Sequence, residues 1–361
     1  MAMIKVQISP QWKLRDQTGQ LLDMSALLGL LTAIQNTGSI ARAAAEVGLS
    51  YRYAWGLLRE GEQLFHDTLM AKTRGQGTTL TPLAEKLIWA DRRVAARLSP
   101  TLESLSSELE TELNRNLMER SKTIRLHASH GFAVATLLHI FNNEQFPIET
   151  QYRNSTDAVA ALSRKECDLA GFHVPLGQFE TAAISRYSQW LNPKSHCLIH
   201  LAIRNQGLFV APGNPKNIRG ISDLNRNKLN FVNRQKGSGT RMLLELMLAE
   251  NHIKSGDING YDNTELTHSA VAAFIASGMA EVGFGVQTAA HRFGLDFIPL
   301  VRERYFLALP SAALDDPLFQ HVISVLQSES YRREISKLAG YDSTDTGTIL
   351  SISEAFPDLP G

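Results

Sequence analysis

The period of the hydrophobic pattern changes near Ser121, and this change most constrains the fold. From about residue 25 to 65, apolar residues recur at steps of three and four, which predicts three short helices. The same spacing runs from 81 to 117, interrupted at Pro100, and predicts a long, kinked linker helix. After Ser121 short apolar runs alternate with helical segments, as is typical of an α/β domain with largely parallel sheets.

These patterns predict an α/β multidomain chain, with boundaries at the changes of period. Residues 195–212 show no obvious helix and could hold crossover strands between two lobes. The end of the chain is rich in Ser, Thr and Asp, and we expect it to be a poorly ordered tail. Strands are expected at 124–128, 148–152, 168–174, 229–232, 281–285 and 297–301. The expected domains are an all-α winged helix-turn-helix (1–81), a linker or dimerisation helix (82–120), a two-lobed α/β domain (121–345) and the tail (346–361).

Composition excludes several classes of protein and leaves DNA binding open. Lys plus Arg equals Asp plus Glu at 36 each, so any affinity for nucleic acid must come from local placement of charge. The two cysteines, Cys167 and Cys197, are too far apart for a zinc knuckle and too few for a disulfide framework. Because the sequence shows neither a secretory signal nor an apolar run long enough for a membrane span, we expect a cytoplasmic protein without a membrane role.

Residues 38–65 have the pattern of a helix-turn-helix. Ser39 begins a short alanine-rich helix, and Ser50 begins a second helix whose first turn carries donors and aromatic rings suited to a major groove. A glycine-rich hairpin at 70–81 is the expected wing. Residues 39–97 hold nine Lys or Arg and six Asp or Glu, a net charge of +3. The candidate DNA-binding residues are Ser39, Arg42, Ser50, Tyr51, Arg52, Tyr53, Arg59, Lys72 and Arg74.

The run GSIARAAAEVGLSYRYAW, followed by the glycine-rich wing and LTPLAEKLI, resembles the molybdate-responsive ModE regulators over about residues 20–98. The LysR family shares the outline, and the segment from Ser50 to Trp55 favours ModE. The resemblance implies duplex DNA as a partner. We expect Trp55 itself to be a core residue rather than a base contact. The resemblance also implies a homodimer, because in such regulators the helix after the wing pairs two subunits, and the leucines at 83–117 suit that role. Packing of the same leucines onto their own domain is the alternative.

Hydroxyl groups and free backbone N–H groups gather where several predicted strands give way to helices. Helix N-termini favour anions, and in open α/β sheets ligands bind beyond the carboxyl ends of strands. Each Ser or Thr alone would be an ordinary helix cap, whereas together they predict an oxyanion site to which two arginines could add charge-assisted hydrogen bonds. The candidate ligand-binding residues are Ser129, His130, Gly131, Ser155, Thr156, Arg234, Gly237, Ser238, Gly239, Thr240, Arg241, Thr267 and His268.

Three further segments, FVNRQKGSGTR, ELTHSAVAAFIASG and AEVGFGV, resemble the periplasmic-binding-protein-like domain that accompanies molybdate-type regulators. The similarity covers about residues 122–310 and implies molybdate or tungstate as the first choice of effector, with formate or another small carboxylate as the second. Neither a P-loop nor a nucleophile elbow surrounds Ser238, no metal cluster accompanies the histidines, and catalysis is not expected. The sequence therefore predicts a ligand-responsive transcriptional regulator. The alternatives are an anion carrier without DNA binding and a molybdenum-cofactor-related enzyme.

Overall fold

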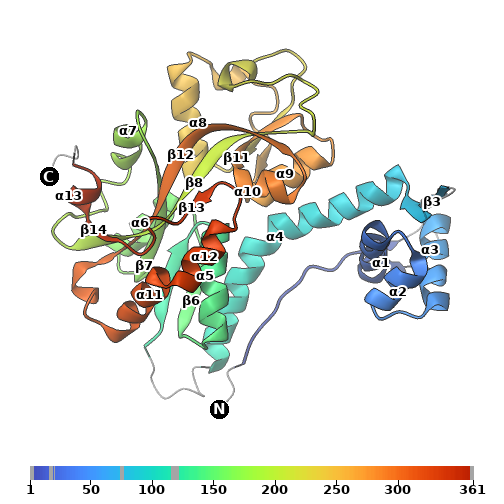
Figure 1. Ribbon diagram of the computed structural model, residues 1–361, viewed down its shortest axis with the longest axis horizontal. Coiled ribbons are helices and arrows are strands. Elements are labelled where there is room, and N and C mark those ends of the chain that lie inside the picture. The colour runs from blue at the N-terminus through green and yellow to red at the C-terminus, as the bar shows by residue number, and fades with distance from the viewer. Residues whose placement is uncertain (1–3, 16–18, 20, 74–76, 115–121, 358–361) are drawn as a thin grey trace. The chain divides into compact units, whose positions relative to one another are not determined.

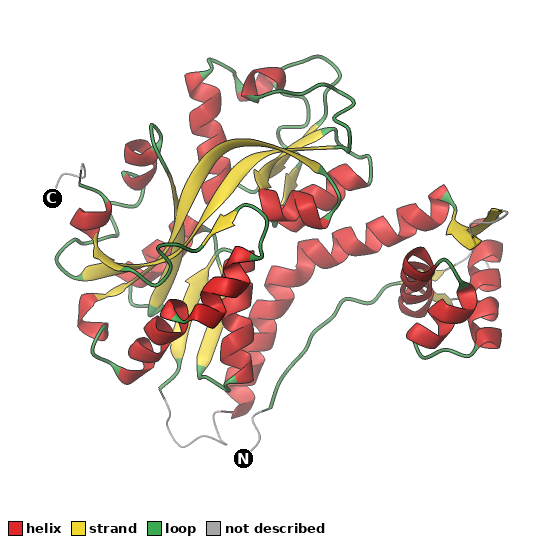
Figure 2. Ribbon diagram, viewed as in Figure 1, coloured by secondary structure: helices red, strands yellow, loops and turns green. Residues whose placement is uncertain are grey.

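The computed structural model describes residues 4–15, 19, 21–73, 77–114 and 122–357. The chain forms two compact units, one of Ser9–Leu98 and one of Met1–Ile8 together with Ser99–Gly361. Figures 1 and 2 show that the smaller unit is mostly helical and that the larger one is built on a long curved sheet.

The smaller unit is a winged helix-turn-helix, as the sequence predicts. Asp23, Ser39 and Ser50 cap its three short helices, because each side chain accepts a hydrogen bond from a backbone N–H in the first turn. The wing strands pair in antiparallel fashion, and the N–H of Thr78 donates to the carbonyl oxygen of Gly38 at 3.0 Å, which fixes the wing beside the turn between the first two helices. The elements are β1 (Lys13–Arg15), β2 (Leu21–Asp23), α1 (Met24–Thr37), α2 (Ile40–Glu46), α3 (Tyr51–Phe65), β3 (Met70–Thr73), β4 (Gly77–Leu80) and α4 (Pro82–Asn114), which continues into the larger unit.

The larger unit has one mixed sheet in the strand order β10-β9-β11-β8-β12-β7-β5-β6, with β13 and β14 also paired to β8. β7 and β11 are buried at every position, which explains their continuous apolar runs. The strands are β5 (Ile124–Ala128), β6 (Ile148–Tyr152), β7 (Leu169–Pro175), β8 (His196–Val210), β9 (Phe231–Arg234), β10 (Thr264–Glu265), β11 (Val282–Val286), β12 (Asp296–Pro310), β13 (Tyr341–Asp342) and β14 (Ile349–Ser351).

Two βαβαβ lobes share this sheet. In one lobe β5 pairs in parallel with β6 and β7, and in the other β9 pairs in parallel with β10 and β11. β8 and β12 are antiparallel crossover strands of 15 residues each that join the lobes, and Figure 1 shows them side by side as long curved arrows. The helices are α5 (Phe132–Asn143), α6 (Ser155–Ser163), α7 (Glu180–Ile184), α8 (Gly239–Glu250), α9 (His268–Ala276), α10 (Gln287–Arg292), α11 (Pro317–Gln327), α12 (Glu329–Ser336) and α13 (Ile352–Ala355).

Both ends of the chain differ from the sequence-based expectation. Residues 346–357 of the expected tail are part of the fold, because β14 pairs with β8 and Phe356 is buried in the core. At the other end, residues 4–8 belong to the larger unit rather than to the DNA-binding domain. Ile4 and Asn114 exchange two hydrogen bonds of 2.9 Å, and the N–H of Val6 donates to Glu110 at 2.9 Å. The N-terminal segment is therefore fastened to the last turns of α4.

Candidate functional site

Helix α3 exposes the polar side chains of its first turn. Tyr51 and Tyr53 are each 54% exposed, and Arg52 between them is also exposed. The opposite face of the helix packs into the core through Ala54 and Leu58. This placement leaves two aromatic rings and a guanidinium free to meet a groove.

The other candidate DNA-binding residues surround this helix or lie outside the description. Ser39 and Ser50 serve as caps of α2 and α3, and Arg59 is exposed on α3. The exposed Arg42 donates to the carbonyl oxygen of Thr37 at the end of α1. Trp55 is half-buried against the core and meets the ring of Tyr51 edge-on, with ring centroids 6.3 Å apart. The backbone of Lys72 lies in β3, whereas its side chain and the whole of Arg74 fall outside the described residues.

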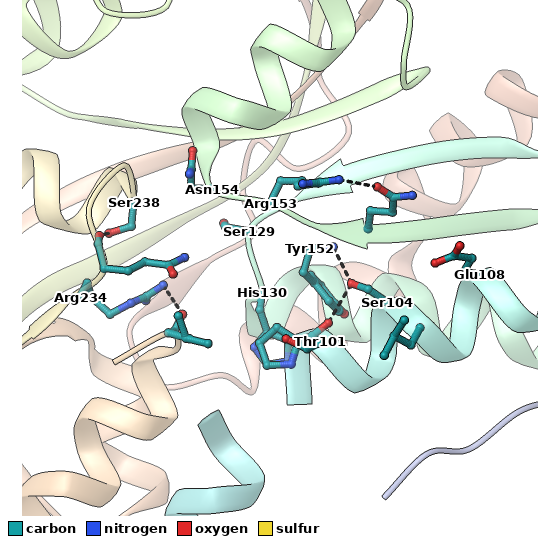
Figure 3. A pocket seen from close by; sticks show the side chains of 15 residues that line it. Thr101, Ser104, Glu108, Ser129, His130, Tyr152, Arg153, Asn154, Arg234 and Ser238 are labelled. Carbon is teal, nitrogen blue, oxygen red and sulfur yellow. Dashed lines mark hydrogen bonds between the residues drawn. The ribbon is translucent and has the colours of Figure 1, made fainter. Parts of the chain in front are cut away.

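The larger unit contains a cavity of about 530 Å³ at the carboxyl ends of its parallel strands. Ser129 and His130 follow β5, residues 153–154 follow β6, and Arg234 and Ser238 lie at and after the end of β9. The cavity is therefore lined from both lobes, at the place where open α/β sheets bind ligands. Figure 3 shows Arg234 and Ser238 together at one end of it, with His130 and Tyr152 nearer its middle.

Beside the cavity lies a buried cluster with more positive than negative charge. Arg204 on β8 and Glu303 on β12 are 2% and 1% exposed and form an ion pair, and Gln206 donates to the same Glu303 oxygen at 2.8 Å. Burial disfavours the charge of Arg204, but the nearby Glu303 and Tyr341 together more than compensate and raise the pKa of the guanidinium. Arg234 is 4% exposed, and burial, together with the charge of Arg204, lowers its pKa to about 9. Two arginines thus share one carboxylate.

Several donors in this cluster have no acceptor among the described residues. Arg234 donates from Nη2 to the carbonyl oxygen of Leu266 at 2.9 Å, whereas its Nε and Nη1 are buried without a hydrogen-bond partner. Nη1 of Arg204 is also without one. A buried donor without an acceptor costs about 1–3 kcal/mol, so these donors call for an acceptor, which a water molecule or a ligand can supply.

Two buried histidines add neutral rings to the cluster. His173 and His268 have pKa values well below the usual range, first because burial disfavours the charged ring and then because the nearby arginines repel it. Nδ1 of His173 lies 3.3 Å from the hydroxyl of Ser155. Nε2 of His173 and Nδ1 of His268 are buried without a partner in the described structure. Neutral imidazoles can each offer one donor to a ligand without adding charge.

Some of the predicted ligand-binding residues line the cavity, others lie next to it without lining it, and one lines a separate groove. Ser129, His130, Arg234 and Ser238 line the cavity. Ser238 and Thr267 cap α8 and α9, whereas α5 begins at Gly131 without a side-chain cap. Arg241 faces a separate groove with Glu245 and Tyr261: its Nε donates to Glu245 at 3.0 Å, and its guanidinium lies 4.0 Å from the ring centroid of Tyr261. Its expected place in the ligand site is not supported.

The remaining predicted residues support the site from behind. The cap of α6 is Asn154 rather than Ser155, so Ser155 and Thr156 lie inside the first turn of that helix. A Cβ on Gly237 would come within 2.9 Å of Asn154 Nδ2, and one on Gly239 within 3.4 Å of Ser155 Oγ. The two glycines therefore let the N-termini of α8 and α6 approach each other closely. Thr240 is buried and accepts a hydrogen bond from Gln206 at 3.0 Å.

Sequence reasoning missed the residues that the crossover strands and α4 contribute. Arg204, Gln206 and Glu303 interrupt two apolar runs, and a charge inside a run that predicts a buried strand is a signal that could have identified them. His173, inside the apolar run of β7, carries the same signal. The lining from α4 has no comparable signal, because Thr101 and Ser104 are ordinary polar residues on a predicted helix.

No group of three or more His, Cys, Asp or Glu side chains in the described ranges is arranged to hold a metal ion. Of the helices that the structure describes, none combines the length and the apolar character needed to cross a bilayer.

Comparison with known proteins agrees with this division of the chain. Residues 26–85 match the bacterial regulatory helix-turn-helix family of lysR proteins, and residues 139–327 match the PBP superfamily domain. The uncharacterised protein YvgK of Bacillus subtilis is 34% identical over 215 residues, which cover 59% of this chain and 68% of YvgK.

Two relatives carry names that refer to molybdenum. The molybdenum-pterin-binding protein MopB of Rhodobacter capsulatus is 36% identical over 119 residues, and the molybdenum transport protein ModE of Herbaspirillum seropedicae is 41% identical over 90 residues. These matches cover 30% and 24% of this chain and only 43% and 32% of the two relatives. The predicted resemblance to ModE, to LysR regulators and to a periplasmic-binding-protein-like domain is confirmed. The chain belongs to the PBP superfamily through its C-terminal domain and joins that domain to a lysR-family helix-turn-helix, as a LysR-type DNA-binding regulator does.

Proposed function

We propose that the chain is a cytoplasmic, homodimeric transcriptional regulator that responds to a small oxyanion bound between the lobes of its C-terminal domain. DNA contact is assigned to the first turn of α3, where Tyr51, Arg52 and Tyr53 are exposed, and to the wing. A LysR-type regulator acts by binding, so this role requires no catalytic group.

The unpartnered donors of Arg234 carry the ligand proposal. Arg204, Arg234 and Glu303 together leave one positive charge beside a cavity, and an anion there would supply the missing acceptors. Each charge-assisted hydrogen bond to a buried guanidinium is worth about 1.5–3 kcal/mol. The site thus favours a compact anion with several oxygen atoms.

Molybdate or tungstate is the first choice of ligand, and formate or another small carboxylate is the second. A tetrahedral oxyanion offers acceptors in several directions at once, which suits donors that come from both lobes. The printed names of MopB and ModE point to molybdenum in two partial relatives. Neutral histidines and hydroxyl groups around the arginines are donors that either class of anion accepts.

The homodimer proposal rests on exposed leucines along α4. Apolar side chains on this helix repeat at a spacing that places them on one stripe, and a stripe of this kind suits pairing with a second copy. The exposed members are Val94 (39%), Leu98 (38%), Leu105 (45%), Leu109 (41%) and Leu113 (49%). Ligand-driven closure of the lobes would then change the geometry of two paired subunits and with it the affinity for an operator.

Two measurements with the wild-type chain test the proposal. Electrophoretic mobility shift with duplexes from a randomised pool should show retardation that weakens as salt rises. Thermal unfolding with sodium molybdate, sodium tungstate and sodium formate should show a higher midpoint for at least one of them, because a ligand that binds only the native state stabilises it. A chain that does not retard duplex DNA at low salt but is stabilised by an anion would instead be a carrier.

A further inference from the structure

Helix α4 covers the free edge of the sheet beside the cavity. Among the described strands β6 is the last of the sheet, so one of its edges has no strand beside it. Two serines of α4 take that place: Ser104 Oγ accepts from the N–H of Tyr152 at 2.9 Å, and Ser107 Oγ accepts from the N–H of Thr150 at 2.8 Å. These bonds satisfy edge groups that would otherwise need water or another strand. The second half of α4 is therefore anchored to the lobe that contains β6.

The same segment of α4 forms one side of the ligand cavity. Thr101, Ser104 and Glu108 line it together with two neighbouring residues of the helix. Figure 3 shows Glu108 at the opposite end of the cavity from Arg234 and Ser238. The wall of the cavity therefore includes α4 as well as both lobes.

Glu103 connects α4 to a residue at the cavity wall. Its Oε1 lies 3.5 Å from Nε2 of His130, and the His130 ring meets Tyr152 edge-on with centroids 4.9 Å apart. Burial alone would raise the pKa of Glu103, but its interactions with His130 and Tyr152 outweigh burial and lower it. The carboxylate is thus charged and directed at His130, which itself lines the cavity.

A proline lies where α4 passes from one unit to the other. The boundary between the units falls at Leu98 and Ser99, and Pro100, the next residue, sits inside the helix. Proline lacks an N–H and crowds the preceding turn, so a helix bends most readily there. The hydroxyl of Ser104 donates to the carbonyl oxygen of Pro100 at 2.8 Å while it accepts from Tyr152. The side chain of Ser104 therefore links the helix at Pro100 to the edge of β6.

We propose that α4 is part of the effector site and that its contacts through Glu103 and Ser104 with His130 and β6 couple the occupancy of the cavity to the DNA-binding unit. This inference rests on the proposed function, since it assigns the route by which that function is regulated. Glu103 acts as a positioning residue for His130, and Ser104 holds α4 at the joint. A ligand changes operator affinity if it binds more tightly when these contacts of α4 are formed than when they are broken, or the reverse.

The test uses the full-length chain without added ligand, so it does not depend on the identity of the effector. Glu103→Ala and Ser104→Ala each loosen α4, and Glu112→Ala, an exposed change near the end of the same helix, is the matched control. The first readout is hydrogen exchange at the Tyr152 amide, which should become faster in Ser104→Ala. The second is affinity for a duplex selected by the wild-type chain, which should change at least about fivefold in both variants, as allosteric coupling free energies imply. The control should stay within about twofold of wild type.

The possible outcomes separate this inference from the proposed function. Faster exchange at Tyr152 with unchanged duplex affinity in both variants would overturn the coupling, because α4 would then be loosened without effect. If one variant does not fold, as shown by the loss of a cooperative melting transition, the other decides. A wild-type chain that binds no duplex would overturn the proposed function, and the coupling with it.

Discussion

Arg204 and Glu303 form an ion pair between the two crossover strands, and both side chains are almost completely buried. Gln206 and Thr240 extend this pair into a chain of hydrogen bonds, in which Gln206 donates to Glu303 and to Thr240. Arg234 lies close enough to the pair for the charge of Arg204 to depress its pKa. The ion pair itself is neutral, so the net positive charge of these three groups is that of Arg234.

Removing the carboxylate should destabilise the larger unit strongly. Glu303→Gln leaves Arg204 as a buried charge without a counter-ion, a change that typically costs about 3–5 kcal/mol. Urea unfolding should show a correspondingly lower midpoint. Glu166→Gln, which breaks the exposed pair with Arg164, is the matched control and should change the midpoint little. Equal midpoints for the two variants would contradict the structural role of the buried pair.

The two arginines near the start of α8 should behave oppositely. Arg234→Leu removes a buried charge with two unpartnered donors, so the unliganded protein should melt a few degrees higher, and its response to molybdate, tungstate or formate should disappear. Arg241→Leu removes an ion pair and a ring contact, so the protein should melt at a lower temperature and keep its anion response. Thermal unfolding with and without anion measures both effects. If only Arg241→Leu lost the response to anions, the ligand would instead bind in the groove that Arg241 lines with Glu245 and Tyr261.

Acid should weaken the fold through the buried histidines. In the folded chain His173 and His268 have pKa values far below 6.5, whereas in the unfolded chain they take up protons below about that pH. Their contribution to stability is therefore present above pH 6.5 and is lost as the pH falls, at about 1.4 kcal/mol per pH unit for each ring. The free energy of unfolding in urea should be lower at pH 5.5 than at pH 7.5, and His268→Gln should reduce that difference. His291→Gln, an exposed change on α10, should retain it.

Arg52 should contribute to DNA binding through its exposed position in the first turn of α3. If the guanidinium reads a base, Arg52→Ala should weaken binding to a selected duplex by about 1–3 kcal/mol. If the guanidinium contacts a phosphate, the affinity of the variant should also depend less steeply on salt concentration. Mobility shift at several salt concentrations distinguishes the two. Arg186→Ala, an exposed arginine of the larger unit, is the control. Indistinguishable curves for Arg52→Ala and wild type would remove this residue from the interface.

The exposed leucines of α4 should hold two subunits together. Leu109 is 41% exposed, and Leu109→Glu would place a charge in the apolar stripe, where a partner helix would have to bury it. Sedimentation velocity should show a shift from dimer toward monomer. Glu112→Ala, on the same helix, should leave the dimer intact. A wild-type protein that sediments as a monomer at every concentration would contradict pairing through this helix.

The sequence was most informative where one local signal was sufficient. The serines that begin α2 and α3, the glycine-rich wing and the strands β5 and β6 all follow from capping, turn chemistry or apolar runs. Ser129, His130, Arg234 and Ser238 could be predicted to face a common site because each follows a strand. The end of the chain was misjudged for the same local reason: its polar composition suggests disorder, while its pairing with β8 depends on a strand about 150 residues earlier.

The sequence by itself determined the two domain types, the helices that carry the DNA-binding residues and the strand ends that carry hydroxyl groups. It did so because periodicity and capping depend on neighbours in the chain. Only the tertiary structure decided that Arg204 and Glu303 pair, that Arg234 keeps unpartnered donors while Arg241 turns away, and that α4 forms a wall of the cavity. These features depend on which segments, far apart in the sequence, pack together and remove each other's side chains from water. A charged side chain that is buried in this way needs a partner, whereas an exposed one does not.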